Sequence, residues 1–108
     1  MATAHDLRRI ALSLPGTIEA PHFDRAAFKV ARIYVTLAAD GKTANFMFTP
    51  DEQDFKCMLL PQAFAPVPNA WGKCGATTGT LSRLSRADLK AALQMAWSHA
   101  LPSKRSRR

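Results

Sequence analysis

The chain has 108 residues, 47% of them hydrophobic, and a formal charge of +7. Two cysteines are too few for a secreted fold that is stabilised by several disulfides. No segment has the character of a signal peptide or a membrane span. We therefore expect a cytoplasmic protein without a membrane partner. The length suits one domain over residues 1–102, followed by a basic tail, 103–108, that we expect to be disordered.

The first predicted element is a helix over residues 4–14. Leu7 and Ile10 recur at helical spacing, and Thr3 is a residue type that caps helix N-termini. Pro15 follows directly and ends the helix, because proline and the glycine after it disfavour its continuation.

Residues 17–48 have the composition of β-structure. The segment from 26 to 39 is long enough for two short strands that meet near Arg32. Asp40-Gly41 predicts a tight turn before a further strand over 43–48. Alternation predicts one buried face on each of the last two strands, formed by Ile33, Val35 and Leu37 and by Ala44, Phe46 and Phe48.

The second predicted helix begins with the most specific local signal in the chain. Thr49, Pro50 and Glu52 make a capping box with proline at the first helical position. We expect this helix to run to about Leu60, because a proline stands just beyond its end. Its spacing predicts three buried side chains, Phe55, Met58 and Leu59.

Residues 61–76 are expected to be irregular, because three prolines and two glycines disfavour regular hydrogen bonding. A last strand is predicted over 77–84. Ser85 and Asp88 then resemble a second capping box. The final helix has its apolar face at Leu89, Leu93, Ala96, Trp97 and Ala100 and stops before Pro102.

In this order the elements predict an α+β fold. We expect an antiparallel sheet of about four to five strands, with three helices packed mainly on one face. Such an arrangement buries the apolar stripe of each helix against the sheet.

Only one pair of side chains suggests acid–base chemistry. His22 and Asp24 would lie on one face of an extended strand, where a carboxylate can orient an imidazole. No third ligand stands at metal spacing, and the chain contains no phosphate-binding glycine loop or nucleophile motif. Cys57 and Cys74 have no histidine beside them and are interpreted as spectator thiols. We therefore expect a non-enzymatic protein with no metal and no cofactor.

The positive charge favours a polyanionic partner, DNA or RNA. Without the four basic residues of the tail, eleven basic residues face eight acidic ones, a net charge of +3. The candidate contact residues are Lys29, Arg32, Lys42, Trp71, Lys73, Arg83, Arg86, Lys104, Arg105, Arg107 and Arg108. Trp71 is included because an indole can stack on a base. The predicted helices all carry apolar stripes for the core rather than a recognition face, so we expect weak, nonspecific phosphate contacts and no sequence-specific readout by a helix. We also expect a monomer.

The segment Pro66–Gly75 supports an alternative function. In this alternative the protein is an adaptor, and the loop binds a protein or a small molecule through Trp71. A third reading is purely structural, with Trp71 pinning the loop to the core.

Several segments together resemble the MmcQ/YjbR family. They are Ala11–Gly16, Glu19–Arg25, Ala27–Val30, Thr49–Gln53 and Pro66–Gly72. The resemblance implies an α+β fold similar to frataxin-like proteins and to a double-wing DNA-binding domain, and it implies DNA binding. Iron binding is not carried over, because the first helix has only Asp6 where an acidic ridge would be needed.

Overall fold

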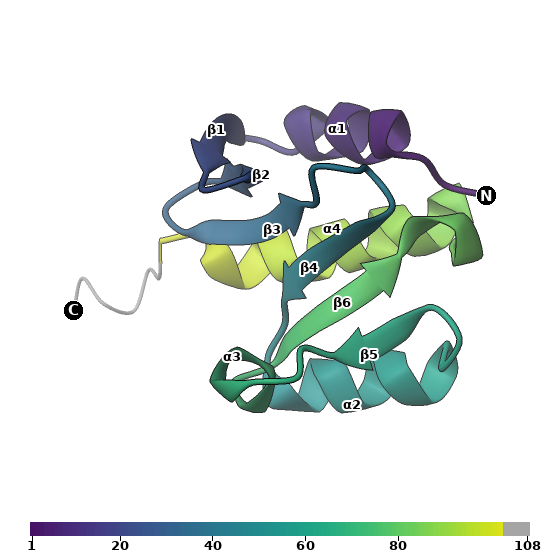
Figure 1. The fold of residues 1–108 in the computed structure, drawn as a ribbon. Coiled ribbons are helices and arrows are strands. Elements are labelled where there is room, and N and C mark those ends of the chain that lie inside the picture. The colour runs from purple at the N-terminus through teal and green to yellow at the C-terminus, as the bar shows by residue number, and fades with distance from the viewer. Residues whose placement is uncertain (103–108) are drawn as a thin grey trace.

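The computed structural model describes residues 1–102 and contains one antiparallel sheet with the strand order β1-β2-β3-β4-β6-β5 (Figure 1). The strands are β1 (Ile18–His22), β2 (Arg25–Lys29), β3 (Ile33–Leu37), β4 (Thr43–Met47), β5 (Phe64–Pro66) and β6 (Ala76–Thr80). The α+β prediction is confirmed. The structure has one or two strands and one helix more than expected.

Four α-helices accompany the sheet in the described residues. They are α1 (Ala4–Ser13), α2 (Pro50–Leu59), α3 (Ala70–Lys73) and α4 (Arg86–Ala100). The capping boxes predicted at Thr49 and Ser85 are both present, and Thr3 forms a third with Asp6. Each box satisfies backbone N–H groups that a helix N-terminus leaves without partners.

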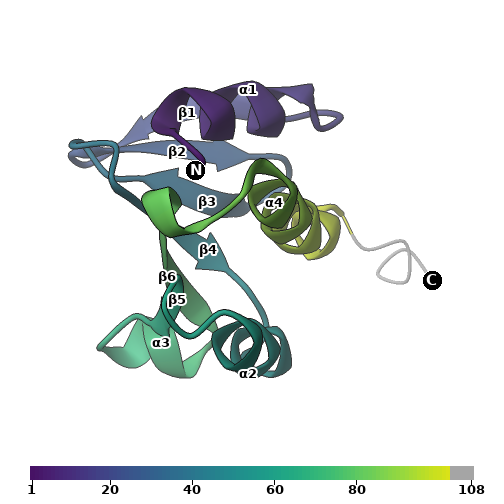
Figure 2. The ribbon, with the colours of Figure 1, turned by 90° about the vertical axis from the view of Figure 1, so that its right-hand side faces the viewer.

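The main core lies between one face of the sheet and helices α1 and α4, while α2 lies beside β5 and β6 (Figure 2). Fully or almost fully buried side chains from both layers meet there: Leu7, Phe28, Val35, Phe46, Leu89 and Leu93. The predicted faces of β4 and α4 are therefore confirmed. Alternate positions on the strands point away from this core, to the opposite face of the sheet.

Strand β3 contains a bulge at Tyr34. Phe28 of β2 pairs with Val35, whereas the next residue of β2, Lys29, pairs with Ile33. One extra residue in β3 is therefore left between two pairs, which is the definition of a bulge. The residues on its two sides no longer follow a simple alternation.

The bulge turns the Tyr34 side chain toward α1. Its hydroxyl donates to the carbonyl oxygen of Ala11 at 3.3 Å and lies 2.9 Å from Oγ1 of Thr17. Ile33 instead lines a groove on the opposite face. The prediction that Ile33 shares a face with Val35 is wrong, because the extra residue shifts the register by one.

Helix α2 is amphipathic as predicted but faces the other way. Phe55, Met58 and Leu59 are 48%, 75% and 54% exposed, whereas Gln53 and Lys56 are buried. The expected burial of the three apolar side chains is therefore wrong. Periodicity shows that a helix has two faces, but the packing partner decides which face turns inward.

Residues 61–76 are more regular than expected, because they contain strand β5 and the short helix α3. Strand β6 ends at Thr80, and a 3-10 turn covers Leu81–Arg83, which shortens the strand predicted over 77–84. Gly79 of β6 leaves room for two rings, because a Cβ atom there would lie 2.8 Å from Phe46 Cε1 and 3.1 Å from Phe64 Cε1.

Candidate functional site

A groove of about 520 Å³ lies on the face of the sheet opposite α1 and α4. Its floor consists of outward positions on the central strands, and its walls come from the β1–β2 turn and from the segment that contains α3. Its lining includes Phe23, Arg25, Arg32, Thr36, Asn45 and Trp71.

The floor of the groove contains a polar part that hydrogen bonds hold in place, beside the apolar side chains of Ile33 and Met47. Arg25 donates from Nε to Thr36 Oγ1 at 2.9 Å and from Nη2 to the Thr36 carbonyl oxygen at 3.1 Å. Thr78 Oγ1 donates to Asn45 Oδ1, also at 2.9 Å. The guanidinium of Arg25 is therefore fixed in orientation and keeps one terminal nitrogen for a further acceptor.

Each wall carries one exposed aromatic ring. Phe23 occupies the tip of the β1–β2 hairpin with φ 58° and is 94% exposed, and its ring contacts that of His22 at a centroid distance of 4.8 Å. Trp71 is 69% exposed on α3. Exposed aromatic rings on opposite sides of one groove are suited to stacking on planar groups.

Hydrogen bonds and close backbone packing hold the segment that carries Trp71 in position. Asn69 accepts from the Trp71 backbone N–H at 2.9 Å, and the buried amide of Gln53 donates to the carbonyl oxygens of Gly72 and Ala76. Gly72 packs so closely on the Val67 backbone that a Cβ atom would overlap it. These contacts place the indole without burying it, so Trp71 is not a core anchor.

A smaller recess of about 380 Å³ adjoins the groove behind Trp71. Arg32 lines both spaces and donates from Nη2 to the carbonyl oxygen of His99, near the C-terminal end of α4. His99 Nε2 lies 2.8 Å from Glu52 Oε1 at the start of α2. The recess thus lies where α4, α2 and α3 meet the sheet.

The structure separates the predicted basic residues into groups. Arg32 and Trp71 line the groove, and Lys29 lies at the end of β2, paired with Ile33. Lys73 lines a different recess, beneath α3. The other three, Lys42, Arg83 and Arg86, lie at the opposite end of β4 and β6.

One of these distant residues has a structural partner. Arg86 Nε lies 3.4 Å from Oδ2 of Asp6, so it connects α4 to α1. The four tail candidates, Lys104, Arg105, Arg107 and Arg108, lie outside the described residues.

Phe23 and Arg25 of the groove were not among the candidate contact residues, although Arg25 belongs to the scattered basic residues that could form a surface. Both lie in the segment His22-Phe23-Asp24-Arg25, in which the sequence suggested a polar cluster. The turn at Phe23-Asp24 was the available signal, because a hairpin tip exposes whatever residue occupies it. What the sequence lacked was the opposite wall, which lies about fifty residues away along the chain.

His22 and Asp24 also line the groove, at the end where Phe23 stands. In residues 1–102 no cluster of three or more His, Cys, Asp or Glu side chains could hold a metal ion. The groove lining beside the pair contains the hydroxyl of Thr36, which accepts from Nε of Arg25.

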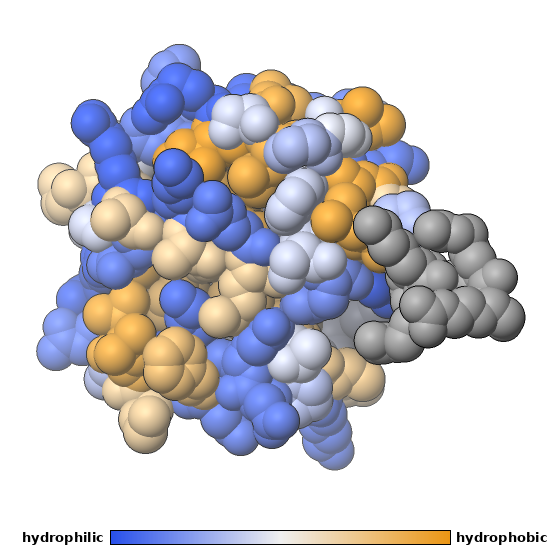
Figure 3. All heavy atoms as spheres, turned by 180° about the vertical axis from the view of Figure 1, so that it is seen from behind, coloured by the Kyte–Doolittle hydropathy of each residue, from blue (hydrophilic) through white to orange (hydrophobic). Residues whose placement is uncertain are grey.

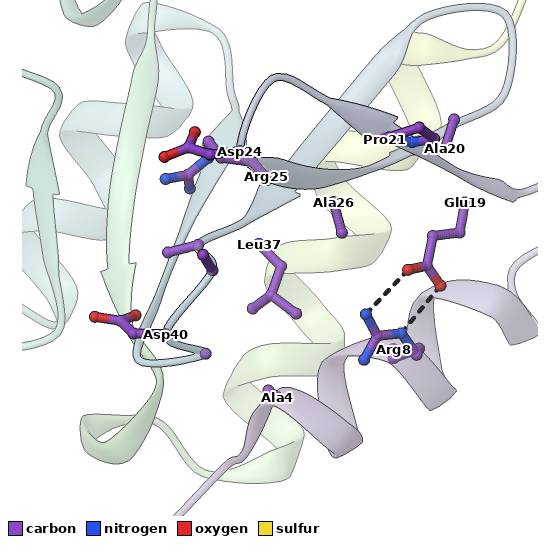
Figure 4. A pocket seen from close by; sticks show the side chains of 13 residues that line it. Ala4, Arg8, Glu19, Ala20, Pro21, Asp24, Arg25, Ala26, Leu37 and Asp40 are labelled. Carbon is purple, nitrogen blue, oxygen red and sulfur yellow. Dashed lines mark hydrogen bonds and ion pairs between the residues drawn. The ribbon is translucent and has the colours of Figure 1, made fainter.

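A larger hollow of about 650 Å³ lies at the β1 edge of the sheet, between α1 and the turn before β4 (Figure 4). Arg8 donates to Glu19 through two hydrogen bonds of 3.0 and 2.9 Å, and the two side chains point at each other across this hollow. The bonds from Arg8 hold the pKa of Glu19 below its usual range. Because the two opposite charges pair with each other, we interpret the ion pair as a structural contact between α1 and β1.

No helix in residues 1–102 combines the length and the apolar character needed to cross a membrane. The sequence matches no family model and no curated protein. Among solved structures, the chain is similar to the crystal structure of Deinococcus radiodurans protein DR2400, whose domain is described as DUF419. The TM-score is 0.72 at 23% sequence identity, over 89% of this chain and 76% of that chain. The two proteins share a fold.

Proposed function

We propose that the protein is a non-enzymatic nucleic-acid-binding module of the MmcQ/YjbR type, which binds single-stranded DNA or RNA weakly along the groove of the open sheet face. The observation that carries this proposal is the presence of two exposed rings, Phe23 and Trp71, and two arginines, Arg25 and Arg32, around one groove. The fold shared with DR2400 supports the family assignment.

The chemistry of the groove suits a flexible strand. Stacking of a base on an aromatic side chain contributes about 1–3 kcal/mol and tolerates any base. A guanidinium is always charged and binds phosphate through its planar fork. A duplex would offer phosphates to the arginines but would keep its bases from Trp71, so we expect a single strand to bind more tightly than a duplex of equal length.

Fluorescence anisotropy of a labelled single strand and of the matching duplex, each across a salt series, tests this function. Trp71→Ala is expected to weaken single-strand binding by about tenfold. Arg32→Gln should reduce the magnitude of the salt slope by about 0.7. Arg83→Gln removes the same charge at the other end of the sheet and is the matched control, which should leave the slope unchanged.

Two results would count against the groove. If Arg32→Gln and Arg83→Gln reduce the affinity equally and Trp71→Ala has no effect, the binding is general attraction to a basic protein. If replacing Lys104, Arg105, Arg107 and Arg108 by Gln abolishes binding, the affinity belongs to the tail.

A second candidate function uses the same wall of the groove. Ile33, Met47 and Val67 add apolar side chains beside Trp71, as is typical of sites for small molecules or extended peptides. The protein would then be an adaptor. In that case Trp71→Ala should abolish binding of the apolar ligand. Arg32→Gln should leave the affinity for that ligand unchanged, and salt should have little effect on the affinity.

A further inference from the structure

The outward face of α2 has a regular composition that the groove does not explain. Apart from Pro50 at its first position, its exposed residues recur at helical spacing, and they are Asp51, Asp54, Phe55, Met58 and Leu59. The first two are acidic and the last three are apolar. On the lower left of Figure 3, apolar side chains gather over the C-terminal half of this helix.

The fold determines which side of α2 turns outward. Gln53 must point inward because its amide donates to the carbonyl oxygens of Gly72 and Ala76. Residues two positions further along a helix lie on a different side, so Phe55 is directed to solvent. Contiguous exposed apolar side chains of this kind mark an interaction surface.

The charges at the two ends of this face are opposite. Asp51 and Asp54 lie at its N-terminal end, whereas Arg83 lines a recess with Leu59 at its C-terminal end. Within residues 1–102 none of the three charged side chains forms an ion pair. The face is therefore negative at one end, apolar in the middle and positive at the other.

We propose that this face binds a second copy of the chain, with the two α2 helices antiparallel about a two-fold axis. In that arrangement Phe55, Met58 and Leu59 of each copy cover those of the other. The acidic end of each helix meets Arg83 of the partner at both ends of the contact, because a two-fold interface repeats every contact. A parallel pair would place carboxylates against carboxylates.

The acidic end also selects against the polyanion proposed for the groove. Three of the eight acidic residues of this basic protein lie within positions 51–54. A nucleic acid would be repelled there, whereas Arg83 of another copy would be attracted; the net charge of +7 on each copy opposes association and weakens the dimer. One helix of ten residues makes a small interface, so the dimer should be weak and should form only at high protein concentration. This proposal replaces the monomer expected from the sequence.

Sedimentation velocity of the full chain over a wide concentration series tests the proposal. The wild type should shift from monomer to dimer, and Leu59→Asp should raise the dimer dissociation constant by at least about tenfold. Leu12→Asp is the matched control, because Leu12 is a similarly exposed leucine on α1, and it should dimerise as the wild type does. A wild type that stays monomeric, or equal effects of the two variants, would overturn the proposal.

Charge reversal tests the antiparallel arrangement separately. Arg83→Glu and the double variant Asp51→Lys/Asp54→Lys should each dimerise less than the wild type, since like charges then face each other. An equimolar mixture of the two should form a heterodimer, because opposite charges meet at both ends. Thermal melting of each variant checks that it is folded. Failure of the folded variants to associate in the mixture overturns the arrangement.

Discussion

Gln53 donates from Nε2 to the carbonyl oxygen of Gly72 at 2.8 Å and so connects the buried side of α2 to the short helix that carries Trp71. The same nitrogen donates to the carbonyl oxygen of Ala76 at 3.0 Å. One amide thereby satisfies two backbone acceptors on either side of the turn between α3 and β6. This side chain therefore contributes both to the position of Trp71 in the groove and to the outward direction of Phe55.

Replacement of Gln53 by Leu should destabilise the protein by about 2 kcal/mol, because two hydrogen bonds of about 1 kcal/mol each are lost, although both carbonyl groups keep a backbone donor. Urea denaturation measures this change in the free energy of unfolding. Gln62→Leu is the matched control at an exposed position and should be nearly neutral. If both variants unfold at the same urea concentration, the amide of Gln53 does not support the segment.

Gly75→Ala should be far more disruptive than Gly41→Ala. Both glycines have positive φ, at 112° and 73°, which alone costs about 1–2 kcal/mol for alanine. At Gly75 the added methyl would also overlap the backbone carbonyl of Phe48, whereas at Gly41 it would lie 3.2 Å from the Ala4 side chain. We expect Gly75→Ala to lose more than about 4 kcal/mol, as seen by thermal melting. Similar melting temperatures would contradict the close approach.

Acid should abolish the contribution of the Arg8–Glu19 ion pair to the free energy of unfolding. The pKa of Glu19 is lowered in the folded protein, so its stabilising effect is complete above the unfolded value of about 4.3 and disappears as the pH falls through the folded value. Since both side chains are partly exposed, the effect at neutral pH should be below about 1 kcal/mol. The difference in unfolding free energy between the wild type and Glu19→Gln should therefore shrink to zero in acid. A difference that persists unchanged at low pH would mean that Glu19 acts through packing.

Cys74 should react with an alkylating reagent before Cys57. Cys74 is exposed, whereas burial and then the nearby carboxylate of Asp54 raise the pKa of the Cys57 thiol. Peptide mass spectrometry at neutral pH gives the two rates. Because Cys74 lines the recess behind Trp71, a bound single strand should slow its alkylation and leave that of Cys57 unchanged. Protection of both thiols would indicate general shielding rather than occupancy of the groove.

Local signals in the sequence predicted where most elements begin. Thr49 and Ser85 initiate helices in the structure as their capping boxes indicate, because a cap depends on residues only three positions apart. The strand that contains Phe64 was missed, since a three-residue strand that ends in a proline has no periodicity of its own. It exists because β6 pairs with it.

The candidate site could be predicted only in part. Trp71 was a candidate contact residue, with a core anchor as its other interpretation, and it lies on the groove; of the candidate arginines within residues 1–102, Arg32 lies beside it. Arg83 and Arg86 were grouped with them by charge alone. The direction of a basic side chain depends on strand order and on the faces of the sheet, which a list of charges does not contain.

The sequence by itself determined the class of the fold, the starts of α1, α2 and α4 and the alternation of β4, because these depend on caps and periodicities that act over a few residues. The tertiary structure alone decided that α2 exposes Phe55, that the bulge at Tyr34 turns Ile33 away from the core, and that Phe23 and Trp71 face one groove. Each of these outcomes depends on contacts between segments far apart in the chain, and such contacts can override a local amphipathic pattern.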